Sequence, residues 1–242
     1  TAATDTPRPA VNRRYQPAHE ADFGVITQAV EMMAAAKAPV FYTGGGIINS
    51  GPQASADLRE LVALTNAPIT STLMGLGSYP ATGPNWLGML GMHGTYEANF
   101  AMNQADLIIC LGARFDDRVT GRLDAFAPNA KIIHVDIDRS SINKIVRADL
   151  PVVADVGPAI KQLIQVWKSR KVKTPDLPEW WARIKGWRAV DCLSYPSGKD
   201  GVIMPQHAIQ RLYEMTQGRK TIVTTEVGGS ALFASRFREA AA

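Results

Sequence analysis

Short apolar segments alternate with amphipathic helical segments along most of this chain. Residues 40–42, 69–72, 107–111, 132–137 and 152–153 are apolar runs of strand length, and the stretches between several of them carry helical periodicity. Strands separated in this way by helices form a parallel sheet that helices cover on both faces. The sequence therefore predicts an α/β fold built on a doubly wound parallel sheet.

Each predicted strand is followed by a loop that is rich in glycine or in polar residues. These loops occupy residues 44–49, 72–77, 112–118, 136–141 and 155–157. Ligands of doubly wound sheets bind beyond the carboxyl ends of the strands, where such loops meet. We therefore expect one ligand site at this edge of the sheet.

Residues 86–126 hold two loops, the first rich in glycine and the second polar, separated by a helix and an apolar strand. The first loop places Met92 and His93 between glycines, and the second carries Arg114, Asp117 and Arg118. A guanidinium just after a buried strand is suited to a bidentate contact with a diphosphate. The block predicts a cradle for a large anionic nucleotide. Two alternatives stay open: His93 caps the helix that follows it, and the second loop is only a cluster of Arg/Asp ion pairs.

Two further features of the loops bear on nucleotide binding. Gly44-Gly45-Gly46 allows backbone N–H groups to approach a phosphate, although Gly51 is too distant for the dinucleotide fingerprint and a plain tight turn is the alternative. Asp136 ends a predicted strand, where an acidic residue can accept hydrogen bonds from a ribose hydroxyl. His134 shares a strand face with Asp136, and we interpret it as structural.

Composition narrows the class of protein. The chain has 242 residues and a net charge of +4, but Lys and Arg are scattered, and the densest run, at 168–173, has no aromatic neighbours. We therefore expect no nucleic-acid partner. We also expect no membrane span, no secretory signal, no disulfide between Cys110 and Cys192, and a cytoplasmic location. The histidines lie in unrelated segments and no nucleophile motif occurs, so we predict no metal site and no catalytic residue in this chain.

The pattern changes along the chain in a way that predicts four segments. Residues 1–20 read as a connecting arm, 21–170 as a central nucleotide-binding domain, 171–203 as a linker with a tryptophan-bearing helix, and 204–242 as the start of a further domain. The helical spacing of Trp180 and Trp187 indicates core packing rather than a stacking surface. One helix at 205–216 and one strand at 221–225 cannot form a core alone.

Longer motifs add a family resemblance. The chain reads YTGGGIINSG at 42–51, ITSTLMGLG at 69–77, HVDID at 134–138, MPQ at 204–206 and TTEVG at 224–228, besides the whole block 86–126. From about Tyr15 to Gly228 it resembles the catalytic large subunit of acetolactate synthase, also called acetohydroxyacid synthase, a thiamine-diphosphate enzyme. The resemblance implies the central domain, which in that family binds FAD on a six-stranded parallel sheet.

The resemblance also implies which residues contact the cofactor. Either Arg13 or Arg14 would touch the flavin from the connecting arm, and Asp117 and Arg118 would lie toward the substrate channel, as would Met92. The remaining implied FAD contacts are Gly44, Gly45, Gly46, Thr72, Leu73, Leu90, Gly91, Met92, His93, Gly112, Ala113, Arg114, Phe115, Asp116, Asp136, Ile137, Asp155 and Val156.

The implied activity belongs to the full-length enzyme. That enzyme decarboxylates pyruvate on thiamine diphosphate and Mg²⁺ and joins the product to pyruvate or 2-ketobutyrate, in branched-chain amino-acid biosynthesis. It would form homo-oligomers and bind a small regulatory subunit. Its activating glutamate and its Gly-Asp-Gly metal motif have no counterpart here, so we expect a fragment that is inactive alone. The alternatives are a non-catalytic FAD- or ADP-binding module and a fragment of a related thiamine-diphosphate oxidase or decarboxylase.

Overall fold

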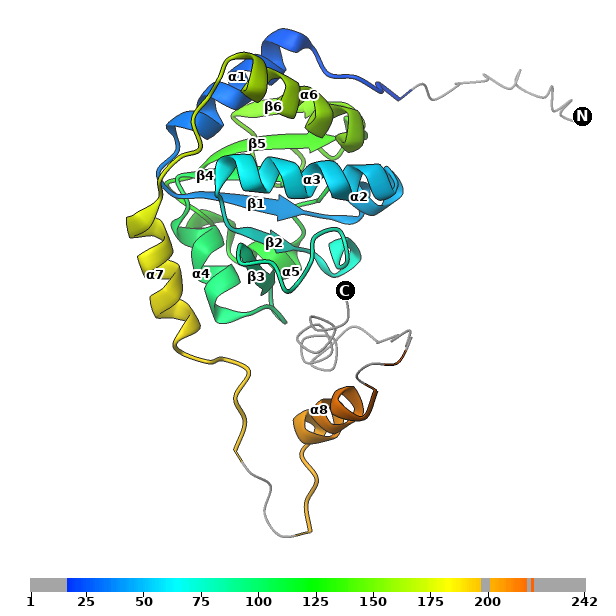
Figure 1. Ribbon diagram of the computed structural model, residues 1–242, viewed down its shortest axis with the longest axis vertical. Coiled ribbons are helices and arrows are strands. Elements are labelled where there is room, and N and C mark those ends of the chain that lie inside the picture. The colour runs from blue at the N-terminus through cyan, green and yellow to red at the C-terminus, as the bar shows by residue number, and fades with distance from the viewer. Residues whose placement is uncertain (1–16, 197–200, 217–218, 220–242) are drawn as a thin grey trace, which may run out of the picture.

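A computed structural model describes residues 17–196, 201–216 and 219 of the chain. Its centre is one sheet of six strands in the order β3-β2-β1-β4-β5-β6, and every neighbouring pair is parallel (Figure 1). This confirms the predicted fold class. The arginines predicted to contact flavin, Arg13 and Arg14, and the predicted strand at 221–225 lie outside the described residues.

The helices and strands have the following bounds. The strands are β1 Pro39–Thr43, β2 Ile69–Ser71, β3 Trp86–Met89, β4 Leu107–Leu111, β5 Lys131–Asp136 and β6 Leu150–Val153. The helices are α1 Phe23–Ala35, α2 Gly45–Asn49, α3 Pro52–Thr65, α4 Tyr96–Gln104, α5 Asp117–Thr120, α6 Val156–Ser169, α7 Pro178–Arg188 and α8 Pro205–Thr216, with 3₁₀ turns at Leu73–Gly75 and Leu123–Ala125.

The strand order places a topological switch point between β1 and β4. Strands β1, β2 and β3 follow one another from the centre of the sheet to one edge. Strand β4 then lies beside β1 on its other side, and β5 and β6 continue to the opposite edge. At such a point the loops after the two central strands diverge to opposite faces, which leaves a crevice at the carboxyl ends. Strand β3 is the one that the apolar pattern misses. It has four residues, and Gly88 interrupts it with a φ of 90°.

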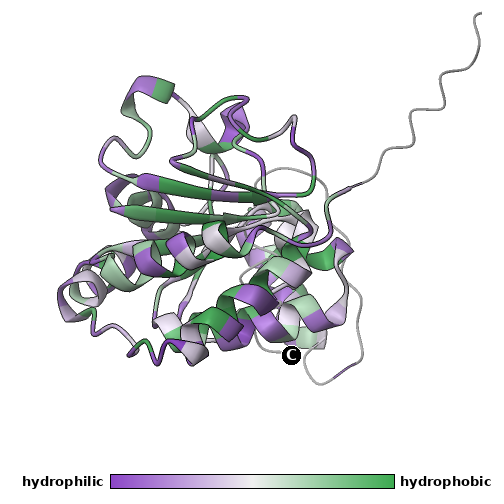
Figure 2. Cartoon of the chain, turned by 90° about the horizontal axis from the view of Figure 1, so that it is seen from above, coloured by the Kyte–Doolittle hydropathy of each residue, from purple (hydrophilic) through white to green (hydrophobic). Residues whose placement is uncertain are grey.

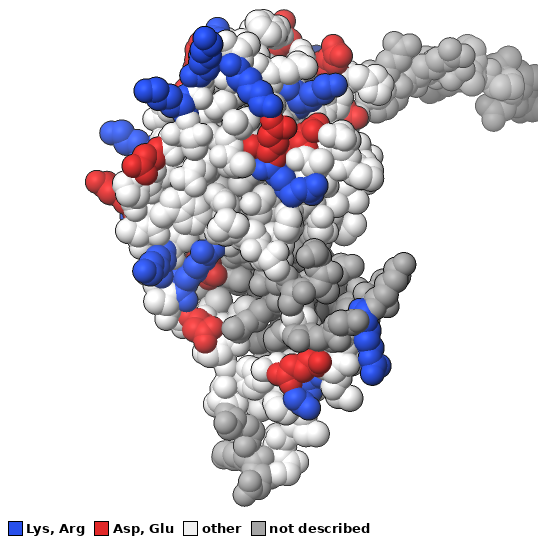
Figure 3. Space-filling model, viewed as in Figure 1, with Lys and Arg blue, Asp and Glu red and all other residues white. Residues whose placement is uncertain are grey.

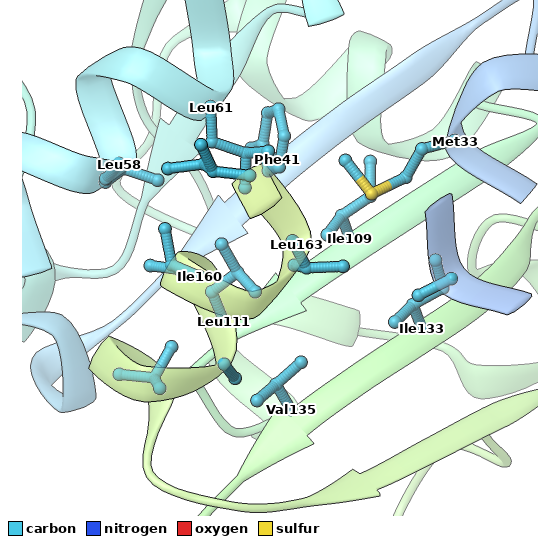
Figure 4. Close-up of a cluster of buried hydrophobic side chains, with 14 of the residues drawn as sticks. Met33, Phe41, Leu58, Leu61, Ile109, Leu111, Ile133, Val135, Ile160 and Leu163 are labelled. Carbon is cyan, nitrogen blue, oxygen red and sulfur yellow. The ribbon is translucent and has the colours of Figure 1, made fainter. Parts of the chain in front are cut away.

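One face of the sheet packs against α1, α3 and α6. Figure 4 shows Leu61 of α3 beside Phe41 of the sheet, and Met33 of α1 and Leu163 of α6 beside Ile109 of the sheet. All five side chains are at most 2% exposed. Burial of a side chain of this size stabilises the fold by roughly 1.5–3 kcal/mol. Figure 2 shows the strands mostly in the colour of hydrophobic residues, whereas the helices carry both hydrophobic and hydrophilic stretches.

The other face packs against α4 and α7. Trp180 and Ile184 of α7 are 2% and 0% exposed and join the apolar cluster that contains Val40 and Ile108. The predicted core role of Trp180 is thus confirmed. The segment that the sequence predicts as a linker, 171–203, contributes this helix to the sheet domain. Helix α8 has no buried residue. Within the described residues, no helix has the length and apolarity needed to cross a membrane.

Candidate functional site

A cavity of about 860 Å³ lies at the carboxyl ends of the strands, over the switch point. Its lining includes residues from the loops that follow all six strands: Gly44 after β1, Thr72 after β2, Leu90 after β3, Gly112 after β4, Ile137 after β5 and Asp155 after β6. The size is typical of a pocket for a cofactor-sized ligand. The location is the one expected from the strand order.

Most residues implied by the resemblance line this one cavity. Among the described residues, Gly91 and Phe115 are the exceptions, because both are buried behind the lining. The residues brought together are Gly44, Gly45, Gly46, Thr72, Leu73, Leu90, Met92, His93, Gly112, Ala113, Arg114, Asp116, Asp117, Arg118, Asp136, Ile137, Asp155 and Val156. Their contact with a ligand remains a prediction.

The glycines after β1 have a packing reason that is independent of any ligand. A Cβ on Gly44 would lie 2.4 Å from the Gly112 carbonyl oxygen, and a Cβ on Gly46 would lie 2.6 Å from the Gly112 Cα. The Gly46 N–H donates to the Gly112 carbonyl at 3.0 Å. Gly112 itself has a φ of 60°, a conformation that favours glycine. The two loops of the switch point therefore touch backbone to backbone. Gly45 and Gly46 belong to α2 rather than to a free turn.

The loop after β3 meets the loop after β4, as the sequence predicts. The Met92 N–H donates to the Arg118 carbonyl at 2.8 Å, and a Cβ on Gly91 would lie 2.7 Å from that same oxygen. His93 lines the cavity and does not cap α4. The cap is Thr95, whose Oγ1 accepts the Ala98 N–H at 3.2 Å. The capping alternative for His93 is wrong.

The loop after β4 carries the ion pairs that formed the second alternative. Arg114 Nη2 lies 3.1 Å from Asp116 Oδ2, and their side chains are 65% and 52% exposed. Arg118 lies 3.9 Å from Asp117, again with both side chains exposed. Exposed pairs of this kind contribute at most about 1 kcal/mol. The ion pairs exist, but they hold Arg114 too weakly to prevent its binding an anion in the cavity.

Asp136 is the buried acid of the site. Its Oδ1 accepts the Asp138 N–H at 2.8 Å, and its Oδ2 lies 4.0 Å from Nε2 of His134. Burial raises the pKa of the Asp136 carboxyl, against the opposing effect of the Asp138 N–H, and burial lowers the pKa of His134. His134 is therefore neutral at pH 7, and the contact is not an ion pair. The structural interpretation of His134, which is 1% exposed, is confirmed.

The far end of the cavity is formed by the turn between β6 and α6. Asp155 caps α6 through the Gly157 N–H, and Ser50 at the end of α2 donates a hydrogen bond to Asp155 Oδ1. The sequence does not reveal Ser50 as a site residue, because no pattern links it to position 155. The other lining residues that the sequence does not reveal are Tyr42, Asn49, Met74, Met89, Val119 and Ser141. Tyr42 lies near the carboxyl end of β1, and Met89 is the last residue of β3. Their places at the carboxyl ends of strands could have indicated that they line the site.

Charges of both signs are interspersed on the face shown in Figure 3, with no continuous basic stripe. Within residues 17–196, 201–216 and 219, no group of three His, Cys, Asp or Glu side chains is arranged to hold a metal ion.

A six-stranded parallel sheet of this order, with a cavity over its switch point, defines a doubly wound α/β domain of the Rossmann type. The sequence comparison narrows this class. Residues 26–163 match the family described as the central domain of thiamine pyrophosphate enzymes. The chain belongs to this family.

Full-length relatives are acetolactate synthases. The chain is 42% identical over 227 residues to the acetolactate synthase isozyme 3 large subunit of Escherichia coli, covering 93% of this chain and 39% of that protein. It is 42% identical to the acetolactate synthase large subunit of Buchnera aphidicola (93% and 38% covered), and 41% identical to the acetolactate synthase of Mycobacterium bovis (92% and 36% covered). The chain thus spans about two fifths of the length of these relatives.

Proposed function

We propose that this chain is the FAD-binding central domain of an acetolactate synthase catalytic subunit. The observation that carries the proposal is the single continuous cavity that touches the loops after all six strands. The names of the relatives support the enzyme, since each is an acetolactate synthase. The family description supports thiamine diphosphate as the cofactor of the whole enzyme.

The extent of the cavity favours a dinucleotide over a mononucleotide. Six strands define five spacings of about 4.8 Å, so the lining extends over roughly 24 Å from β3 to β6. A nucleoside monophosphate or diphosphate fills only part of that length. An extended FAD molecule, with a ring system at each end and a diphosphate between them, contacts both edges and the centre.

The donors and acceptors fit such a molecule in one direction. Asp136 Oδ2 makes no hydrogen bond within the described residues, and an acceptor at a strand end suits a ribose hydroxyl. Arg114 lies over the central switch point, where its guanidinium suits a diphosphate. Met74 and Met92, 75% and 64% exposed, supply an apolar, polarizable wall for a flat ring system at the β3 end.

The proposed activity is the joining of a two-carbon unit, obtained from pyruvate by decarboxylation, to a second 2-ketoacid. In this enzyme the present domain binds FAD and contributes Asp117 and Arg118 to the wall of the substrate channel. Thiamine diphosphate with Mg²⁺ supplies the carbanion chemistry when bound elsewhere in the enzyme. We further propose a homo-oligomer with a small regulatory subunit, in line with the "large subunit" of the relatives' names, in a cytoplasmic branched-chain amino-acid pathway.

Flavin binding by the purified chain tests the ligand. We expect FAD to bind with quenching of its fluorescence and to be released on denaturation, and FMN and ADP, which each lack half of the contacts, to bind at least about 100-fold more weakly. If the chain binds ADP as tightly as FAD, it is instead the non-catalytic ADP-binding module that the sequence leaves as an alternative.

A chimera tests the enzyme. Residues 22–170 replace the matching region of the Escherichia coli relative, and the products formed from pyruvate are measured. Acetolactate as the main product supports the proposal. Acetaldehyde or acetate as the main product would identify the domain with a decarboxylase or an oxidase.

A further inference from the structure

Three neighbouring strands present a row of polar side chains on the buried face under α4. Tyr42 of β1 is directly opposite Cys110 of β4, and Cys110 is directly opposite His134 of β5. Each is at most 1% exposed. We call Tyr42, Cys110 and His134 the support row. Polar groups at this depth need a partner, and the three find theirs in one short segment.

All three side chains donate to two consecutive carbonyls of the loop after β4. The Tyr42 hydroxyl donates to the Arg114 carbonyl at 2.6 Å. His134 Nε2 and Cys110 Sγ lie 2.9 Å and 3.2 Å from the Ala113 carbonyl, and both donate to it because a carbonyl only accepts. Ala113 thus uses both of its lone pairs. His134 must carry its proton on Nε2.

The loop is also fixed from below by an aromatic side chain. Phe115, 4% exposed, packs between Tyr42 and His134, with ring centroids 5.4 Å and 5.3 Å away. Ala113 is buried as well, whereas Arg114 and Asp116 are exposed. The segment is therefore extended, with alternate side chains directed inward to the support row and outward to the cavity. Fixing Ala113 and Phe115 determines where Arg114 points.

Burial keeps the donors in the protonation state that these bonds require. It raises the pKa of the Tyr42 hydroxyl and of the Cys110 thiol, and it lowers the pKa of His134. At pH 7 the tyrosine and the cysteine keep their protons and the histidine is neutral. His134 Nδ1 has no hydrogen-bond partner in the described part of the chain, so the histidine is held by the loop alone.

We propose that the support row consists of positioning residues that hold the loop at 112–116 in the shape that directs Arg114 into the cavity. Cys110 and His134 do not line the cavity, and Tyr42, which does, commits its hydroxyl to the Arg114 carbonyl. Its effect on affinity rests on the proposed function, because Arg114 is taken to bind the FAD diphosphate. The shape of the loop does not rest on it.

The first experiment measures FAD affinity by fluorescence titration of the 242-residue chain. Tyr42→Phe removes one oxygen and keeps the ring, and we expect affinity to fall about threefold to tenfold, as for one hydrogen bond. For Arg114→Ala we expect the FAD affinity to fall about tenfold or more. Because Tyr42 acts through Arg114, the double variant binds no more weakly than Arg114→Ala alone. Additive losses would overturn the proposal.

Position 134 offers a conservative rescue. The side-chain amide of Gln can donate from nearly the position of imidazole Nε2, whereas Leu cannot donate. We expect His134→Gln to bind FAD within about threefold of the wild type, and His134→Leu to lose about tenfold. Equal losses in the two variants would show that the histidine only fills space, which overturns its positioning role.

The second experiment reads the loop without any ligand, through the two cysteines. Cys192 is exposed and labels at once with a thiol reagent, so it serves as the internal standard, while Cys110 is buried beneath Ala113. We expect Tyr42→Phe and His134→Leu to raise the labelling rate of Cys110 at least about fivefold, through local opening of the loop. Ile133→Val, in β5 but on the opposite face, is the control for general destabilisation and leaves that rate nearly unchanged.

The two experiments separate the two possible failures. If the wild type binds no FAD but Tyr42→Phe still exposes Cys110, the proposed ligand fails and the support row stands. If the wild type binds FAD while neither affinity nor Cys110 labelling changes in Tyr42→Phe and His134→Leu, the support row fails and the proposed ligand stands.

Discussion

The two ends of the sheet use polar groups in opposite ways. At the carboxyl end, the loops surround a cavity, and the guanidinium of Arg114 pairs with the exposed Asp116. At the amino end, α7 crosses the start of the sheet. There the indole N–H of Trp180 donates to the Pro39 carbonyl at 3.0 Å, and that of Trp181 donates to the Asn66 carbonyl at 3.1 Å.

A third contact completes the closure of the amino end. Arg188 of α7 donates to the carbonyl of Trp86, the first residue of the edge strand β3. Figure 1 shows α7 beside the edge of the sheet, next to α4. Backbone carbonyls that would otherwise be left open are thus satisfied by side chains of one helix. The comparison indicates that stability is concentrated at the amino end and ligand binding at the carboxyl end.

Truncation of the central tryptophan of α7 is the strongest way to test this separation. We expect Trp180→Ala to lower the free energy of unfolding by about 3–5 kcal/mol, because it removes a large buried side chain and leaves the Pro39 carbonyl unpaired. Urea denaturation measures the loss. The FAD affinity of the folded fraction should be unchanged within about twofold. A larger change would show that the two ends are coupled.

Adding a methyl group at the switch point should lower both the stability of the fold and the affinity for FAD. Gly46→Ala places a Cβ 2.6 Å from the Gly112 Cα, and we expect a loss of about 1–3 kcal/mol in the free energy of unfolding together with weaker FAD binding. The adjacent Gly45→Ala is the matched control. Its Cβ comes closest to the Met74 Cβ, at 3.3 Å on a side chain that is 75% exposed, and lies at an ordinary contact distance of 3.6 Å from the Met74 carbonyl oxygen. If Gly45→Ala is as destabilising as Gly46→Ala, the backbone contact is not the cause.

Local pattern was enough to predict the fold class and the edge of the sheet that carries the cavity. Both follow from short apolar runs with polar loops after them, which is information within a few residues. It failed at β3, where Gly88 has a φ of 90° and breaks the alternation within four residues. It also failed to show that α7 belongs to the sheet domain, since that depends on contacts with Pro39 and Asn66, far away in the chain.

The family resemblance predicted most of the residues that line the cavity. Neither the local sequence pattern nor the resemblance could predict the support row. Tyr42, Cys110 and His134 lie in three separate strands and share no motif. Only the register of β1 against β4 and of β4 against β5 places them in line. Strand register depends on the assembled sheet, so a sequence pattern does not reveal such a row.

Removing the charge of Asp136 should separate binding from stability at the carboxyl end. Burial raises the pKa of this carboxyl, so the fold favours its protonated form. Its contribution to stability is therefore present at acid pH and lost as pH rises through the raised pKa. Asp136→Asn avoids this loss. We expect its free energy of unfolding to exceed that of the wild type increasingly from about pH 4 upward, until the pH has passed the raised pKa of Asp136.

The same variant should bind FAD about tenfold more weakly at pH 7, because a neutral amide is a poorer acceptor for a ribose hydroxyl. Urea denaturation across pH and flavin titration measure the two effects. The prediction is that the charged Asp136 carboxylate serves ligand binding and lowers the stability of the fold. An Asp136→Asn variant that is less stable than the wild type at pH 7 would contradict it.

The smallest effect is expected from replacing a glycine of α7, at the amino end of the sheet. Gly186 lies in α7, is exposed, and has no atom within 4 Å of the position where a Cβ would be added. Alanine restricts the unfolded chain and favours the helix, so Gly186→Ala should raise the free energy of unfolding by about 0.5–1 kcal/mol without changing FAD affinity. Set beside Gly46→Ala, the same substitution then has opposite signs at the two ends of the sheet. Equal signs would mean that helix propensity, rather than contact between loops, governs both positions.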